Sequence, residues 1–147
     1  MRKKSNIKSA SLKKLLTLFI SSCAFLISVC IANAQSKTWT APDEAAGVKN
    51  PLAGNIETLK YAQVIYTTYC SPCHGNKGRG GGAAASGLAT KPADHSSGII
   101  QKQTDGALFW MISEGRNPMP SYKTALTDNQ RWELVNYIRT LAKTPKK

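Results

Sequence analysis

The sequence is poor in the side chains that bind structural metals. It has 4 cysteines and 2 histidines in 147 residues. A structural zinc site needs four nitrogen or sulfur ligands. Beyond the cluster at residues 70–74, the only further candidates are Cys23, Cys30 and His95. Because both of these cysteines lie in an apolar N-terminal stretch that we interpret below as a targeting segment, the sequence argues against a zinc site.

Signals for nucleotide and nucleic-acid binding are also missing. Residues 78–83 match the pattern G-x-G-x-x-A, but no strand precedes them and no paired acidic residue follows at the right distance. No Gly-Lys-Ser/Thr phosphate loop occurs. Basic residues are scattered rather than clustered, and no nucleic-acid motif is present. Nor is there an internal repeat or a convincing strand pattern, so we expect no dinucleotide domain and no nucleic-acid partner.

Acidic residues are absent from residues 1–14, which hold six basic ones. An apolar run from Leu15 to Ile31 follows, and then the small-x-small sequence at residues 32–34. This order predicts a secretory signal peptide over residues 1–34, cleaved after Ala34, and a periplasmic protein. Two alternatives stay open. The 17-residue apolar run can just span a bilayer as an uncleaved anchor facing the periplasm, and residues 20–23 loosely resemble a lipoprotein cleavage box, although the apolar run continues beyond it.

The most informative stretch that is present is Cys70-Ser71-Pro72-Cys73-His74. A C-x-x-C-H pentad is typical of c-type haem attachment, in which the two thiols form thioethers with the haem vinyl groups. The next residue, His74, then lies over the ring face and can ligate the iron. A thioredoxin-like dithiol is the main alternative, but nothing before Cys70 reads as a buried strand. The sequence therefore predicts one covalent haem c on Cys70 and Cys73.

Helical patterns account for most of the remaining chain. Residues 35–54 are rich in Ala, Pro, Gly and Lys without periodicity, and we predict a flexible N-terminal arm there, followed by one domain over residues 55–147. Three helices are expected, at residues 55–69, from Thr104 or Asp105 to Glu114, and from a capping box at Thr127 to Ala142. Residues 75–87 are expected to be a glycine-rich loop. The fold class is therefore a small all-α domain, with about three helices wrapped around one covalent haem.

The opposite face of the iron needs a separate ligand, for which Met and His are the strong-field candidates. Met111 shares helical spacing with apolar neighbours, which favours core packing. Met119 lies between two prolines in a stiff loop that can hold a thioether in place. His95 looks like an exposed loop residue. From the residues alone, all three stay open.

Three blocks of sequence resemble the class I cytochromes c, the single-haem bacterial type. Tyr66-x-x-x-Cys70-x-x-Cys73-His74-Gly75 is similar to their attachment region. Gly115-x-x-x-Met119-Pro120-x-Tyr122 is similar to their methionine loop, and Trp132-x-Leu134-Val135-x-Tyr137-Ile138-Arg139 to their C-terminal helix. The resemblance spans residues 55–142, with the blocks in family order.

The resemblance implies roles for individual residues. Cys70 and Cys73 would be the thioether anchors, and His74 and Met119 the axial iron ligands. Ala62 and Tyr66 would meet Leu134 and Tyr137 where the terminal helices cross. In many relatives a proline carbonyl soon after the haem motif accepts the proximal His Nδ1–H, whereas the first proline here is Pro92.

These features together predict a periplasmic carrier of single electrons rather than an enzyme, because an iron with both axial positions filled has no vacancy for substrate. Removal of residues 1–34 leaves a net charge of +6, which suits docking onto acidic redox partners, a donor dehydrogenase or reductase and an acceptor oxidase. Lys77 and Arg79 could frame that docking, and Trp110 and Tyr122 are candidates for contacts to the haem propionates. A fixed relay subunit of a larger respiratory complex is the first alternative, and a five-coordinate haem sensor or peroxidase is the second.

Overall fold

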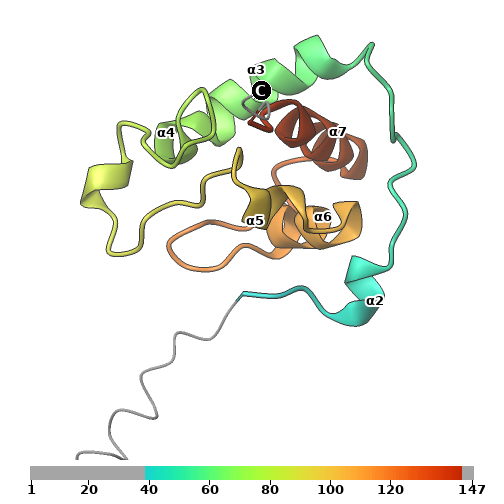
Figure 1. The fold of residues 1–147 in the computed structure, drawn as a ribbon, viewed down its shortest axis with the longest axis horizontal. Coiled ribbons are helices and arrows are strands. Elements are labelled where there is room, and N and C mark those ends of the chain that lie inside the picture. The colour runs from blue at the N-terminus through green and yellow to red at the C-terminus, as the bar shows by residue number, and fades with distance from the viewer. Residues whose placement is uncertain (1–38, 144–147) are drawn as a thin grey trace, which may run out of the picture. The chain divides into compact units, whose positions relative to one another are not determined.

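The computed structural model describes residues 39–143 (Figure 1). This part of the chain holds six α-helices and one 3-10 helix, and its only strand-like pairing is an isolated bridge between Arg116 and Met119. The predicted signal peptide lies outside the described residues. The elements are α2 (Asp43–Ala46), α3 (Leu59–Tyr69), α4 (Ser71–His74), η1 (Ala85–Gly87), α5 (Gly98–Gln101), α6 (Asp105–Glu114) and α7 (Asp128–Thr140).

The two later helices begin where the sequence predicted; α6 also ends there, whereas α7 ends at Thr140, two residues before the predicted Ala142. Thr104 caps α6 by accepting a hydrogen bond from the Ala107 amide. Thr127 and Gln130 form the predicted capping box at the start of α7, each side chain bonding the other's backbone. Gly115, at φ +64°, ends α6 in a conformation that a residue with a Cβ rarely adopts. Helix α3 begins at Leu59, later than predicted, because residues 55–56 are irregular and residues 57–58 form a turn.

Helices α3 and α7 lie side by side and form the centre of the core (Figure 1). Three large side chains in this region are fully buried: Tyr66, Leu134 and Val135. The Tyr66 ring lies 5.0 Å from the Tyr137 ring, and Ala62 is also fully buried. The predicted meeting of the two terminal helices is therefore confirmed, and it places the start of α4 directly beyond the core.

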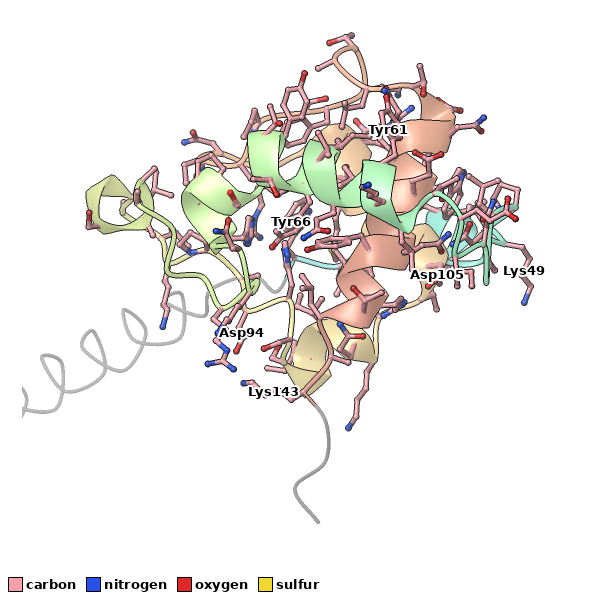
Figure 2. All side chains as sticks on the ribbon, turned by 90° about the horizontal axis from the view of Figure 1, so that it is seen from above. Lys49, Tyr61, Tyr66, Asp94, Asp105 and Lys143 are labelled. Carbon is pink, nitrogen blue, oxygen red and sulfur yellow. The ribbon has the colours of Figure 1, made fainter. Side chains whose placement is uncertain are left out.

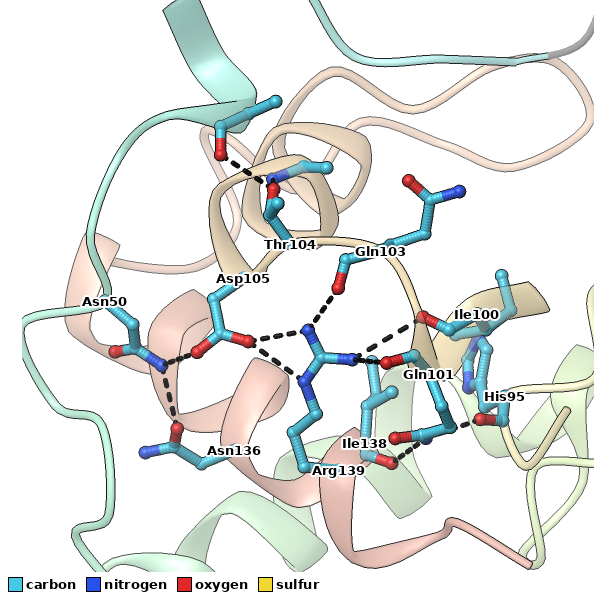
Figure 3. A network of polar contacts seen from close by, with 12 residues as sticks. Asn50, His95, Ile100, Gln101, Gln103, Thr104, Asp105, Asn136, Ile138 and Arg139 are labelled. Atoms are coloured by element: carbon cyan, nitrogen blue, oxygen red, sulfur yellow. Dashed lines mark hydrogen bonds and ion pairs between the residues drawn. The ribbon is translucent and has the colours of Figure 1, made fainter. Parts of the chain in front are cut away.

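The segment before α3 contacts α6 and α7 through polar groups. The Thr104 hydroxyl donates to the Ala46 carbonyl oxygen at the end of α2. Asn50 Nδ2 donates both to Asp105 and to Asn136 Oδ1, and Arg139 bonds the same Asp105 carboxylate through Nε and Nη2 (Figure 3). We call Asn50, Asp105, Asn136 and Arg139 the Arg139 cluster. It joins three parts of the chain that are distant in sequence.

The structure confirms an all-α architecture in the described residues, with α3, α6 and α7 as the three principal helices. None of the helices in residues 39–143 has the length and apolarity needed to cross a membrane.

Candidate haem-attachment site

The two cysteines of the attachment motif lie on one turn of helix. Cys70 ends α3, and α4 begins at the next residue, so that the Cys73 and His74 amides both donate to the Cys70 carbonyl. Both thiols are free and half-buried. Burial first, and the nearby Cys73 second, raise the pKa of the Cys70 thiol to about 12. This raised pKa keeps Cys70 a neutral thiol.

A glycine loop at residues 75–82 is joined to this turn by backbone hydrogen bonds. The Gly80 amide donates to the His74 carbonyl at 2.8 Å and the Gly82 amide to the Cys73 carbonyl at 3.0 Å. A Cβ on Gly82 would lie 2.2 Å from the Pro72 carbonyl oxygen and 2.4 Å from that of Ser71. Side chains would therefore push the loop off α4. The glycines that the sequence suggested as a weak nucleotide motif instead allow close backbone approach.

His74 is buried, and its ring is held by a single backbone acceptor. Its Nδ1 lies 2.9 Å from the Ala93 carbonyl oxygen, so the ring donates this hydrogen bond and Nε2 keeps its lone pair. Burial lowers the pKa of His74, opposed by the Ala93 hydrogen bond. A neutral imidazole with a fixed tautomer is the form that ligates iron. The acceptor belongs to the residue after Pro92, a position that sequence reasoning did not single out.

His95 is not the exposed loop residue that the sequence suggested. Its ring stacks on the His74 ring, with centroids 4.0 Å apart and planes 20° from parallel. Its Nδ1 lies 3.0 Å from the Tyr66 hydroxyl oxygen. Burial first, and the adjacent His74 second, lower the pKa of His95 to about 3, so the ring is neutral. The polar neighbours of His95 in sequence gave no sign of this packing.

The loop that carries Met119 is fastened to the end of α6. Met119 and Arg116 exchange two backbone hydrogen bonds, of 2.8 and 3.0 Å. The Ser121 hydroxyl donates to the Ser113 carbonyl oxygen, and the buried Arg131 side chain donates to the Ser113 hydroxyl. The Met119 side chain is half-buried. Met111 is buried on α6, as core packing predicts.

Tyr122 lies beside the attachment motif. Its hydroxyl donates to the Tyr69 carbonyl oxygen at 2.8 Å. Burial, followed by the nearby Cys70 and Cys73, raises its pKa to about 12. Its contact to a haem propionate stays a prediction, as does that of Trp110.

The donor set fits a covalent haem better than a bare metal ion. Within residues 39–143, no group of three or more His, Cys, Asp or Glu side chains could hold a metal. The two free thiols lie one turn apart, and the imidazole that follows them has its Nδ1 already bonded. These groups would hold a covalent haem through two thioethers and one axial ligand. These three residues lie together as the sequence predicted. The Met119 assignment and the thioether bonds themselves stay predictions.

The family model that this chain matches describes a cytochrome c. Residues 57–138 match the family model described as cytochrome c oxidase, cbb3-type, subunit III. A search of curated proteins found no match. Among solved structures, a chain of the Kuenenia stuttgartiensis reducing HAO-like protein complex Kustc0457/Kustc0458 is similar, with a TM-score of 0.58 and 30% identity over 65% of this chain. The match covers 50% of that chain, so this protein corresponds to about half of it. The structure described as KustC0563 c-type cytochrome has a TM-score of 0.49 and 26% identity, over 56% of this chain and 98% of its own.

Proposed function

The chain belongs to the family described as cytochrome c oxidase, cbb3-type, subunit III, and we propose that it is a periplasmic carrier of single electrons with one haem c. Membership makes the protein a class I c-type cytochrome with the small all-α fold of that class, and implies covalent haem c and haem-based electron transfer. The number of haems, the axial ligands and the compartment are the parts that we propose.

The observation that carries the proposal is the hydrogen bond from His74 Nδ1 to the Ala93 carbonyl oxygen. It leaves Nε2 as the metal-binding nitrogen and fixes the orientation of the ring. The glycine loop then excludes side chains from the turn that holds Cys70, Cys73 and His74. These residues therefore bind, orient and partly bury the cofactor, whose iron supplies the one-electron redox chemistry when bound.

The position of His95 bears on the sixth ligand. Two imidazoles that bind one iron from opposite faces have the metal between them, whereas His95 and His74 stack face to face at 4.0 Å. His95 therefore lies on the His74 side, which argues against bis-histidine ligation by this pair. Met119 is the better candidate, because its loop is held by the Arg116 backbone and by Ser121, independently of helix packing. Methionine ligation would raise the reduction potential.

The decisive experiment examines the protein made in a host with cytochrome c maturation machinery. We expect an intact mass with one haem added and residues 1–34 removed, and haem that resists extraction by acidic acetone. Oxidised protein should show the weak far-red sulfur-to-iron band, and reduced protein should bind little carbon monoxide. An unmodified mass or extractable haem would contradict covalent attachment.

Two methionine variants test the ligand assignment. Met119→Ala should abolish the far-red band, lower the potential and open the iron to carbon monoxide. Met111→Leu is the matched control, because it replaces a buried methionine by a side chain of similar volume and should leave all three properties unchanged. The reverse outcome would assign the ligand to Met111. Strong carbon monoxide binding by the haem-loaded wild-type protein would favour the five-coordinate sensor or peroxidase.

A fixed relay subunit is the second candidate. One similar structure is described as part of a protein complex, and this chain matches 50% of that chain. The same domain could therefore receive and pass electrons while held by a larger partner. Size-exclusion chromatography of the native protein distinguishes the two: a free carrier elutes as the single chain, and a relay subunit elutes with its redox partners.

A further inference from the structure

A second aromatic ring backs the face of the proximal ligand. The His95 and His74 ring centroids are 4.0 Å apart and the planes are nearly parallel. The His74 ring makes one hydrogen bond, at Nδ1. One hydrogen bond by itself still allows the plane of the imidazole to turn. A ring stacked flat on the imidazole opposes that rotation by steric contact. His95 is therefore placed to restrict the one movement that the Ala93 bond leaves free.

His95 is itself held by several hydrogen bonds, which fix the position of its ring. We refer to this fixed His95 ring as the plate. The His95 backbone amide donates to the Gly78 carbonyl at 2.6 Å, which ties it to the glycine loop. Its carbonyl accepts from Gln101 Nε2, which also donates to the Ile138 carbonyl on α7 (Figure 3). The hydroxyl oxygen of the fully buried Tyr66 lies 3.0 Å from Nδ1 of the His95 ring. The plate is therefore fixed from α3, α7 and the loop together.

The fit around His95 is tight. A Cβ on Gly78 would approach the His95 Cβ to 2.9 Å and the Tyr66 hydroxyl oxygen to 3.3 Å. Residue 78 therefore has no room for a side chain, and the glycine loop packs closely against the His95 backbone and Tyr66. Figure 2 shows Tyr66 between α3 and α7 and Asp94, the residue before His95, on the adjoining loop.

We infer that His95, held by Tyr66, is a positioning residue that sets the orientation of the proximal His74 imidazole and shields it from water. This inference rests on the proposed function, because it concerns the haem ligand. The plane of an axial imidazole determines how the unpaired electron of oxidised iron is distributed over the porphyrin. Exclusion of water favours the less charged, reduced state of the centre, so the plate should hold the potential up.

The test compares three variants of the haem-loaded protein. His95→Ala removes the plate, and Tyr66→Phe keeps the plate but removes its hydrogen bond. Ser97→Ala is the control, because it weakens the α5 cap on the same loop without removing a group that touches His74. Each is measured for covalent haem by mass, for the haem-methyl shifts of the oxidised state by proton NMR, and for the midpoint potential.

We expect all three variants to carry haem. His95→Ala should change the order or spread of the methyl shifts and lower the potential, Tyr66→Phe should move both in the same direction by less, and Ser97→Ala should leave both unchanged. Loaded His95→Ala and Tyr66→Phe proteins with wild-type shifts and potential would overturn the inference. If His95→Ala does not accumulate, Tyr66→Phe decides: moved shifts support the inference and unmoved shifts overturn it. Wild-type protein without covalent haem would instead overturn the proposed function, and this inference with it.

Discussion

The Arg139 cluster and the glycine loop hold the two ends of the domain in opposite ways. In the cluster, side chains make the contacts: Asp105 accepts from both Arg139 and Asn50 (Figure 3). Arg139 also donates to the backbone carbonyls of Gln101 and Gln103. In the glycine loop, backbone bonds backbone, with no side chains between the loop and α4.

The difference follows from what each end must leave free. The charged and amide groups of the cluster bond one another and nearby backbone carbonyls, so they are occupied by the fold itself. The glycine loop bonds the turn through main-chain groups. The thiols of Cys70 and Cys73 and the Nε2 atom of His74 would therefore remain available to a cofactor. Variants at the two ends should therefore fail differently: loss of cluster residues should lower stability, and loss of residues at the loop should lower haem attachment.

The largest effect is expected at the attachment end. Cys70→Ala with Cys73→Ala removes both thioether positions and leaves an apolar surface without its cofactor. A domain of this size has a limited core, so the double variant should fail to accumulate as folded protein. The measurement is the yield and far-ultraviolet circular dichroism of periplasmic protein. Normal yield of a fully helical, haem-free variant would show that the core is sufficient by itself.

Substitutions where α3 packs against α7 should lower the stability of the whole domain. Tyr66→Ala and Leu134→Ala should each reduce the free energy of unfolding by about 2–5 kcal/mol, as expected for truncation of large buried side chains. Because Tyr66 and Leu134 belong to the same core cluster, the losses should not be additive. Urea denaturation of both single variants and the double variant gives the coupling, and strict additivity would mean that the two side chains act independently.

At the cluster end, Arg139→Ala should lower stability without lowering haem content. It removes the charged bonds to Asp105 and leaves that half-buried carboxylate with Asn50 alone, at a cost of about 1.5–3 kcal/mol. Lys123→Ala is the control, because its ion pair with Glu114 is exposed and should be worth at most about 1 kcal/mol. Loss of haem from a folded Arg139→Ala protein would contradict the separation of the two ends.

The glycine loop offers a matched pair of substitutions. Gly82→Ala places a Cβ against the Pro72 and Ser71 carbonyls and should cost about 1–3 kcal/mol, with less haem attached per chain. Gly81→Ala adds the same methyl group where nothing lies within 4 Å and should have little effect. Haem per chain is measured by absorbance against total protein. Equal haem content in the two variants would show that close contact with α4 is not needed.

The smallest expected effect is on the pH dependence of stability. Hydrogen bonds from Ser96 and Lys143 lower the pKa of Asp94 from 3.8 to about 2. The folded state therefore binds this proton less readily than the unfolded state, so the contribution to stability is present above pH 4 and is lost as the pH falls toward 2. Asp94→Asn should flatten the fall of the melting temperature between pH 4 and pH 2, and Lys143→Met should flatten it partly. An unchanged slope in both would show that these contacts do not hold in solution.

Local signals predicted the helices well, because they depend on neighbouring residues. The capping box at Thr127 and Gln130, the cap at Thr104 and the stop at Gly115 could all be recognised from sequence. The attachment motif is equally local, which explains why Cys70, Cys73 and His74 are found together.

Features that depend on distant contacts could not be predicted. His95 has polar neighbours, and its burial comes from α3 and from His74 across the fold. The acceptor for His74 follows from the path of the loop past Ala93, not from a proline. Likewise, Asn50 lies in a segment of featureless composition, and its partners Asp105 and Asn136 are 55 and 86 residues away.

The pairing of α3 with α7 has a consequence for the order of events during synthesis. These helices are far apart in sequence, so their contact closes a chain segment of about 70 residues. Contacts between residues so distant in sequence form late. The last described residue, Lys143, adds a bond from its amide to the Ser96 carbonyl beside His95. The cysteine turn, by contrast, is complete as soon as residue 74 has emerged. Closure of the core is therefore a late step, and the turn that holds the two thiols can form before it.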